Sequence, residues 1–427
     1  MKKKVIGILF LVILRLGIPD PCYAADMEGE LILSTWDNDL INYMNENDMI
    51  GCFQKKYPMA DITVEKIKDE LEYWNIMEIR ASANQLPDIM FNKPYTLCRF
   101  QDYLIDLSEL EASDQNILAE QYAINGQILG IPITCQYNYV YYWKDLFADA
   151  GVTVPETWEE FENISLKLQK YYESKKENFS AVAIGVKDEW TTYPFMEFMP
   201  ALESGNGNIW NDMVKKDSPF SENTDVFQAY EKIYQLFTLG VCGDAPLDRG
   251  NTQAVRAFTQ KDAAMIALGD WGLKGIEAAI SDDSSLGAFY LPVRNTKDIP
   301  FRIMIQGDPF MGVTAHSKNP DLAKAFVEWF YSEEWYPGYI NYVSGNSAMA
   351  TFPKEKPQVL LEADQRQPEV ETIIYKPINN AFRLLQNEVE FDYRKFGTEM
   401  FTEDFQLYKR LQELDRRWKT AKRNFFG

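Results

Sequence analysis

Residues 125–161, NGQILGIPITCQYNYVYYWKDLFADAGVTVPETWEEF, decide the fold because their turn, strand and helix signals follow one another in a fixed order. The pair Asn125 and Gly126 is a strong hairpin-turn signal between apolar runs. An alternating strand is predicted over residues 137–142, and a short helix over residues 144–150 follows it. Gly151 is expected to end that helix.

The same stretch then signals the start of a longer helix. Pro155 comes first, Thr157 is the predicted N-cap, and Glu160 lies three residues later, as in a capping box. Strands and helices also alternate through the rest of the chain. This alternation predicts an α/β fold with largely parallel sheets.

The order of these signals resembles the core of the family 1 extracellular solute-binding proteins of ABC importers, the family of maltose-binding protein. Further fragments agree with the family pattern in the same order along the chain; they are Leu86-Pro87-Asp88-Ile89, Ala263-Ala264-Met265, Gly269-Asp270-Trp271, Leu291-Pro292 and Ser317-Lys318-Asn319-Pro320. Two positions depart from it. Trp143 stands where the family usually has Asn, and Lys261 stands where it often has Gly.

The resemblance implies a two-lobed periplasmic-binding-protein-like fold, in which each lobe is a mainly parallel sheet flanked by helices. It assigns residues 25–134 and 306–350 to the N-terminal lobe, and residues 135–305 and 351–427 to the C-terminal lobe. The chain would then cross between the lobes three times. A length of 427 residues suits two lobes of about 150–200 residues each.

The N-terminus predicts export. Three lysines at residues 2–4 precede an apolar run over residues 5–14, and small residues occupy the −3 and −1 positions of a cut after Ala24. Residues 1–24 are therefore predicted to be a signal peptide, with a run too short to span a membrane. Cys22 is an alternative lipid-anchor site, but the preceding residues 19–21, Pro-Asp-Pro, match such a site poorly.

The charge balance excludes nucleic acid as a partner. The chain has 64 acidic and 43 basic residues, a net charge of −21, and phosphate binding needs clustered Lys and Arg. The single histidine, His316, argues against Ser-His and Cys-His catalysis. We expect no cofactor, no metal and no catalytic residues, although 64 acidic residues leave room for a glycosidase carboxylate pair.

Aromatic residues next to polar residues suggest a sugar site. A sugar has an apolar C–H face and a rim of hydroxyls, so it is bound by stacked rings and by polar side chains. Such residues occur where strands are expected to end, which is where α/β sheets bind ligands. The candidates from the first lobe are Trp36, Asp37, Asn38, Asp88, Asn92 and Tyr95.

The remaining candidates lie at the expected crossings or match second-lobe aromatic residues of the family; they are Gln136, Tyr137, Asn138, Trp190, Trp271 and Asp308. Three candidates also have a purely structural interpretation. Trp36 could fill the core, Asp88 could brace a strand, and Tyr137 could pack inward.

These observations predict an exported, monomeric protein that captures a carbohydrate, in particular an oligosaccharide, in a cleft between two lobes. The resemblance implies delivery to a membrane ABC permease by hinge closure. Two alternatives stay open. One is a binding protein for a cationic or peptide ligand, and the other is a secreted glycoside-active enzyme.

Overall fold

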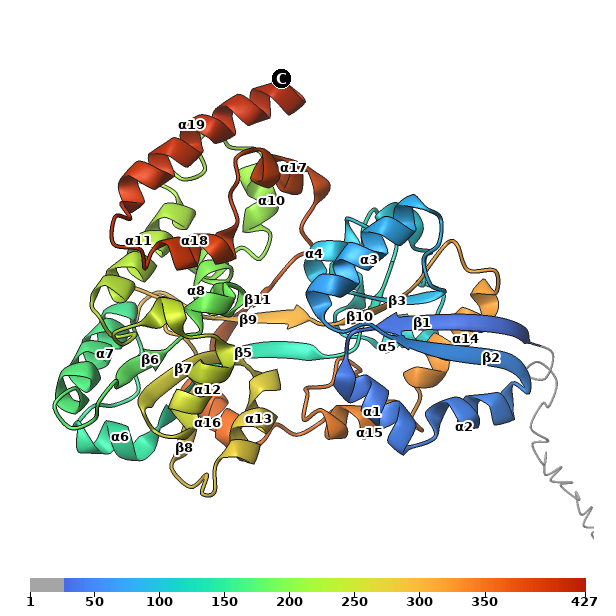
Figure 1. Ribbon diagram of the computed structural model, residues 1–427, viewed down its shortest axis with the longest axis horizontal. Helices are drawn as coiled ribbons and strands as arrows, with labels where there is room; N and C mark the ends of the chain where they lie inside the picture. Colours follow the sequence, from blue (N-terminus) through green and yellow to red (C-terminus); the bar gives the residue numbers. More distant parts are fainter. Residues whose placement is uncertain (1–26) are drawn as a thin grey trace, which may run out of the picture.

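Two β-sheets, each with its own hydrophobic core, organise the chain into two lobes (Figure 1). The computed structural model describes residues 27–427. The predicted signal peptide, residues 1–24, and Cys22 lie outside the described residues. No helix between residues 27 and 427 is long and apolar enough to cross a membrane.

The first sheet has five strands in the order β2-β1-β3-β10-β4; they are β1 (Glu28–Thr35), β2 (Met59–Lys66), β3 (Ile89–Asn92), β4 (Ile131–Pro132) and β10 (Phe310–Val313). Alternate residues of β1, such as Leu31 and Leu33, are buried in the first core. The helices around this sheet are α1 (Asn38–Glu46), α2 (Met49–Lys56), α3 (Glu70–Ser82), α4 (Pro94–Leu97), α5 (Glu111–Gln115), α14 (Pro320–Phe330) and α15 (Tyr336–Tyr342).

The second sheet has the order β11-β9-β5-β7-β6, with β8 also paired to β5; its strands are β5 (Cys135–Trp143), β6 (Ser180–Ala183), β7 (Ala263–Gly269), β8 (Leu286–Phe289), β9 (Phe301–Gly307) and β11 (Val370–Ile374). Every residue of β7 is buried, as expected for a central strand covered on both faces. The surrounding helices are α6 (Lys144–Asp149), α7 (Trp158–Tyr172), α8 (Tyr193–Met196), α9 (Met199–Ser204), α10 (Ile209–Met213), α11 (Asp225–Thr238), α12 (Asn251–Thr259), α13 (Leu273–Ala279) and α16 (Gln358–Arg366).

The end of the chain adds three helices to the second lobe, α17 (Asn380–Glu388), α18 (Tyr393–Glu399) and α19 (Leu407–Phe426) (Figure 1). Phe382, Phe396 and Trp418 from these helices belong to the second core. α17 also faces the first lobe, because the side chain of Asn380 donates to the carbonyl of Cys98 at 3.2 Å. The tail therefore closes one side of the space between the lobes.

The α/β class is confirmed, but the sheets are mixed rather than mainly parallel. β1 pairs in parallel with β2 and β3, and β11 and β6 pair in parallel with β9 and β7. β5 pairs antiparallel with β7, β8 and β9, and β10 pairs antiparallel with β3 and β4. The chain leaves the first sheet through β4 and β5 and re-enters it through β9 and β10. Because the chain leaves along one connection and returns along the other, the two neighbouring connections run in opposite directions, and their strands pair antiparallel.

The local signals in residues 125–161 correspond to real turns and caps. Asn125 and Gly126 have φ angles of 53° and 81°, and Gly151 has a φ of 62° after α6. The Thr157 hydroxyl accepts a hydrogen bond from the backbone N–H of Glu160 at 3.3 Å. The Glu160 carboxylate instead accepts from the backbone of Glu156 at 2.7 Å, so only half of the expected capping box forms.

Trp143 and Lys261, the two residues that depart from the family pattern, contact each other in the structure. Lys261 has a φ of 58°, a backbone conformation that favours glycine, and its ammonium lies 4.5 Å from the centre of the Trp143 ring. A cation over an indole ring is stabilising by about 0.5–1 kcal/mol at such partly exposed sites. This contact offsets part of the backbone strain that a non-glycine residue brings to this turn.

Candidate ligand-binding site

A cavity of about 670 Å³ lies between the two sheets and takes lining residues from both lobes. Its volume falls within the range of about 300–1,000 Å³ that is typical of small-molecule sites. The lining residues are Asp69, Glu70, Leu71, Trp74, Lys93, Pro94, Tyr95, Gln136, Trp190, Tyr193, Glu197, Phe198, Trp271, Gln306, Asp308, Tyr375 and Arg394. The cavity thus combines an aromatic wall with a polar wall.

The aromatic wall is built around Trp190 and Trp271. Their ring centres are 6.0 Å apart, and the two residues are 37% and 39% exposed. Tyr193 stacks behind Trp190 at 6.5 Å and accepts a hydrogen bond from the backbone N–H of Gly269 at 2.7 Å. Gly269 also makes room for the indole, because a Cβ at this position would lie 2.3 Å from Nε1 of Trp271. Two large rings are therefore held with apolar surface facing the cavity.

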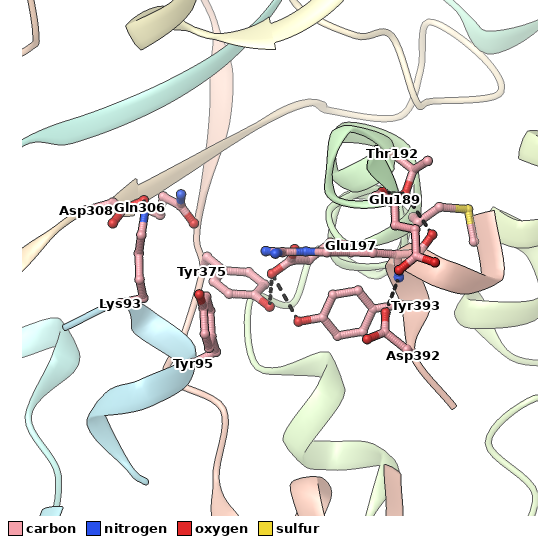
Figure 2. A network of polar contacts seen from close by, with 12 residues as sticks. Lys93, Tyr95, Glu189, Thr192, Glu197, Gln306, Asp308, Tyr375, Asp392 and Tyr393 are labelled. Atoms are coloured by element: carbon pink, nitrogen blue, oxygen red, sulfur yellow. Dashed lines mark hydrogen bonds and ion pairs between the residues drawn. The ribbon is translucent and has the colours of Figure 1, made fainter. Parts of the chain in front are cut away.

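The polar wall is centred on Lys93, which follows β3. Its ammonium lies 2.8 Å from Oδ2 of Asp308 and 3.8 Å from Oε2 of Glu70. The Tyr95 hydroxyl and the Trp74 indole N–H both donate to the Glu70 carboxylate. Figure 2 shows Lys93 extending from the first lobe toward Asp308, with Tyr95 beside it. One ammonium thus holds two carboxylates at the floor of the cavity.

Burial sets the protonation of this cluster. It raises the pKa of Asp308 to about 6, even though Lys93 acts in the opposite direction. Burial alone would lower the pKa of Lys93, but the carboxylates of Asp308 and Glu70 raise it overall, so Lys93 is charged at neutral pH. The second oxygen of Asp308, Oδ1, is buried and has no hydrogen-bond partner among the described residues.

A second polar cluster surrounds Glu197, which is only 2% exposed. Its carboxylate accepts from the hydroxyls of Tyr375 at 2.8 Å and Tyr393 at 3.3 Å, as Figure 2 shows. It also accepts from Nε and Nη2 of Arg394 at 2.9 and 2.8 Å. These contacts hold the guanidinium of Arg394 5.6 Å from the centre of the Tyr95 ring, across the space between the lobes.

The structure brings Tyr95, Gln136, Trp190, Trp271 and Asp308, among the residues expected from the sequence, to the cavity. Gln136 lies on β5 where this strand pairs with β9, and its amide donates to the backbone carbonyl of Asp308 at 3.3 Å. Its own carbonyl accepts from Gln306 at 3.3 Å. Both connections between the sheets therefore contribute polar groups to the floor.

The candidates that follow β1 do not line the cavity. Trp36 packs against the rings of Tyr73 at 4.7 Å and Trp74 at 5.3 Å, behind the polar wall. Asp37 is the N-cap of α1 and accepts from the second and third residues that follow it. Asn38 begins α1 and is exposed. A helix start also requires polar residues after a strand, and here Asp37 and Asn38 serve as the N-cap and first residue of α1 rather than as ligand contacts.

The other four candidates also lie outside the lining. Asp88 braces the first sheet by accepting from the backbone of Ile32 at 2.8 Å and from Ser317 at 2.6 Å. Asn92 is fully buried. Tyr137 is half-buried beneath the ammonium of Lys356, which lies 4.0 Å from its ring centre, and Asn138 lines a separate, smaller cavity in the second lobe.

Several lining residues were not among the sequence candidates. Glu197 carried a usable signal, because it is a lone carboxylate within the apolar run of residues 195–202. Lys93 lies directly after the β3 strand, between two residues that were candidates. Tyr375 and Arg394 come from the C-terminal part of the chain, and nothing in their local sequence places them near β3.

Comparisons with known proteins agree with this architecture. Residues 48–358 match the family model described as bacterial extracellular solute-binding protein. The multiple sugar-binding protein of Streptococcus mutans serotype c is 24% identical over 352 residues, which cover 76% of this chain and 78% of that protein.

Two solved structures show the same fold. A chitin oligosaccharide binding protein superimposes with a TM-score of 0.77 and 18% identity, covering 93% of this chain and 99% of its own. BlMnBP1 of Bifidobacterium animalis subsp. lactis in complex with mannobiose gives a TM-score of 0.74 and 17% identity, covering 93% and 96%. The resemblance drawn from the sequence is confirmed, and the chain belongs to the bacterial extracellular solute-binding proteins.

Proposed function

We propose that the protein captures a carbohydrate, specifically an oligosaccharide, in the cavity between its lobes. The observation that carries this proposal is the pairing of Trp190 and Trp271, whose rings face a cavity with a polar opposite wall. Apolar C–H faces of a sugar stack on indole rings, while its hydroxyls need acceptors such as the side-chain carbonyl of Gln306 and donors such as Arg394, both of which line the cavity. The sugar-binding protein of Streptococcus mutans supports the same ligand class.

The charge distribution gives less support to a cationic or peptide ligand. Lys93 already neutralises Asp308 and Glu70 in part, and Arg394 neutralises Glu197. The negative charge of the whole chain is therefore not concentrated at the cavity. A glycoside-active enzyme is also less well supported, because Asp308 and Glu70 are both tied to Lys93 and the family consists of binding proteins.

The mechanism we propose is closure of the lobes around the sugar, followed by delivery to a membrane ABC permease. The hinge would consist of the β4–β5 and β9–β10 connections, with a third passage near residues 350–353. Hydrogen bonds also join residues of the two proposed lobes: Asn346 donates to Asp270, and the ammonium of Lys274 donates to the carbonyl of Tyr342 at 2.8 Å. A ligand favours the closed state only by the excess of its contacts there.

We further propose that residues 25–134 and 306–350 move as one lobe, and residues 135–305 and 351–427 as the other. The protein would act outside the cytoplasmic membrane as a monomer, after removal of residues 1–24. The family assignment supports the extracellular location.

A thermal-shift screen tests the ligand class directly. Mono- and oligosaccharides form one arm, and polyamines, amino acids and short peptides form the other. A ligand present at 100 times its dissociation constant stabilises the folded state by about 2.7 kcal/mol, which is easily detected. We expect oligosaccharides to give the largest shifts, without any product detectable by chromatography. Stabilisation confined to polyamines or peptides, or turnover of a sugar, would contradict the proposal.

A further inference from the structure

A second cavity of about 650 Å³ adjoins the first, and the two share Tyr95 and Arg394 as lining residues. It lies between the α3–α4 region of the first lobe and helices α17 and α18 of the second lobe. Its other lining residues are Glu78, Arg99, Ile378, Arg383, Gln386, Asn387, Glu390, Phe391, Asp392, Tyr393 and Lys395. It contains no tryptophan, so it differs in character from the first cavity.

Acidic side chains in this second cavity already have partners. Glu78 forms an ion pair with Arg99 at 2.8 Å, and Glu390 forms one at 3.0 Å with Arg417, which lies outside the lining. Asp392 caps α18 by accepting from the backbone N–H groups of two residues that follow it. The carboxylates are therefore committed to structural contacts.

The basic side chains are only partly matched. Arg99, Arg383, Arg394 and Lys395 outnumber the three acidic residues, which is unusual in a chain with a net charge of −21. Arg383 forms no side-chain hydrogen bond or ion pair with any residue between 27 and 427. The Nε atoms of Arg99 and Arg383 are both buried without a hydrogen-bond partner among these residues.

The two arginines also repel one another. Burial lowers the pKa of Arg383, and the positive charge of Arg99 lowers it further, while the nearby Glu78 carboxylate raises it in part. Glu78 forms an ion pair with Arg99 but not with Arg383, so the two partly buried guanidinium groups on opposing lobes carry one more positive charge than this carboxylate neutralises. A guanidinium binds a carboxylate or sulfate through two parallel hydrogen bonds, a geometry that an ammonium cannot offer.

We propose that this second cavity binds the anionic substituent, a carboxylate or a sulfate, of a glycan whose neutral part lies on Trp190 and Trp271. Arg99 and Arg383 hold the anion from opposite lobes, and the chain of the glycan passes between Tyr95 and Arg394. The proposal rests on the proposed carbohydrate function and narrows it to acidic oligosaccharides. It also gives the anion a part in drawing the two lobes together.

The test compares matched ligands that differ in one terminal group. For each oligosaccharide backbone retained from the thermal-shift screen, a form ending in a hexuronate and its carboxyl-reduced, neutral counterpart are titrated by calorimetry. We expect the acidic form to bind at least tenfold more tightly, and to lose this advantage as salt is raised, because the contact is electrostatic. Inorganic sulfate and free glucuronate form a separate arm that tests for a site for small anions.

The variants are Arg383→Gln and Arg383→Lys, with Arg256→Gln as the matched control. Arg256 is exposed on α12, and within residues 27–427 its guanidinium forms a single hydrogen bond, to the side chain of Gln260. We expect Arg383→Gln to abolish the preference for the acidic form while leaving affinity for the neutral form within twofold. Arg383→Lys should keep part of the preference, since it retains charge without the planar fork, and Arg256→Gln should keep all of it.

Three results would overturn the inference. The neutral form could bind as tightly as the acidic form, the preference could survive in Arg383→Gln, or inorganic sulfate alone could stabilise the protein as much as the acidic glycan does. If neutral oligosaccharides bind and acidic ones do not, only this inference fails. If no carbohydrate of either kind binds, the proposed function fails with it.

Discussion

Replacing Trp271 by alanine separates a ligand-binding role from a structural one. The indole is 39% exposed, and its neighbour Trp190 is similarly open to the cavity. If the exposed face of Trp271 is where a sugar ring stacks, the substitution removes ligand contact while most of the core stays intact. A tryptophan that belonged to the core would behave in the opposite way.

The expected magnitude follows from the exposed area. A tryptophan side chain presents roughly 250 Å² of surface, so an exposure of 39% leaves roughly 100 Å² for a ligand to cover. At about 25 cal/mol per Å² this contact is worth at most about 2.5 kcal/mol. Removal of an aromatic stacking partner costs about 1–3 kcal/mol, so both scales agree. We expect the dissociation constant of Trp271→Ala to rise roughly 5- to 60-fold.

Isothermal titration calorimetry with the best oligosaccharide from the screen measures this change, and urea unfolding measures stability in parallel. The free energy of unfolding should fall by about 1 kcal/mol or less, as for other partly exposed positions. Phe425→Ala is the control, because Phe425 is 44% exposed near the end of α19, outside the cavity lining. It should bind the sugar like the parent protein.

Two outcomes would refute this reasoning. One is a Trp271→Ala protein that binds the sugar as tightly as the parent. The other is a variant that loses several kcal/mol of stability, which would show that the indole supports the fold rather than the ligand.

The remaining predictions concern stability, pH and motion. Glu197→Gln should lower the free energy of unfolding by about 2–4 kcal/mol in urea titrations, because it breaks a buried pair with Arg394, whereas the exposed-site control Glu403→Gln should change it little. Burial raises the pKa of Asp270 from 3.8 to about 7, so folding favours its protonated form, and the stability of the parent should fall as pH rises between these values. Asp270→Asn should flatten that dependence, and an equally steep curve in the variant would assign it to other groups. Small-angle scattering should show a smaller radius of gyration at saturating sugar, and an unchanged radius would argue against lobe closure.

Local sequence signals were sufficient for the elements but not for the direction of the strands. The turn at Asn125 and Gly126 and the N-cap Thr157 each depend on a few neighbouring residues. Strand direction depends on pairing partners that are far apart, such as Gln136 and Gln306, which are 170 residues apart. A pattern of alternating strands and helices therefore predicted the α/β class while missing that the strands joining the two sheets pair antiparallel.

For the site residues too, local sequence predicted some positions correctly and could not predict those that depend on tertiary packing. Trp271 follows a strand and lies between Asp270 and Gly272, and this local setting correctly suggested an exposed ring. Asp37 had an equally suggestive setting, yet its carboxylate caps a helix, because one pattern of residues satisfies both roles. Arg394 had no usable signal, since only tertiary packing carries α18 to Tyr95.

The fit between Gly269 and the Trp271 indole restricts how these proteins can diverge. Since any side chain at position 269 would occupy the space of that ring, alanine or a larger residue there is compatible only with a displaced or different residue at position 271. Substitutions at the two positions should thus be correlated, and residues other than glycine are expected at position 269 where position 271 is not tryptophan. A related protein that binds a different ligand and has lost this tryptophan is therefore expected to carry a second substitution at the position of Gly269. The two positions together would indicate whether the stacking ring is present.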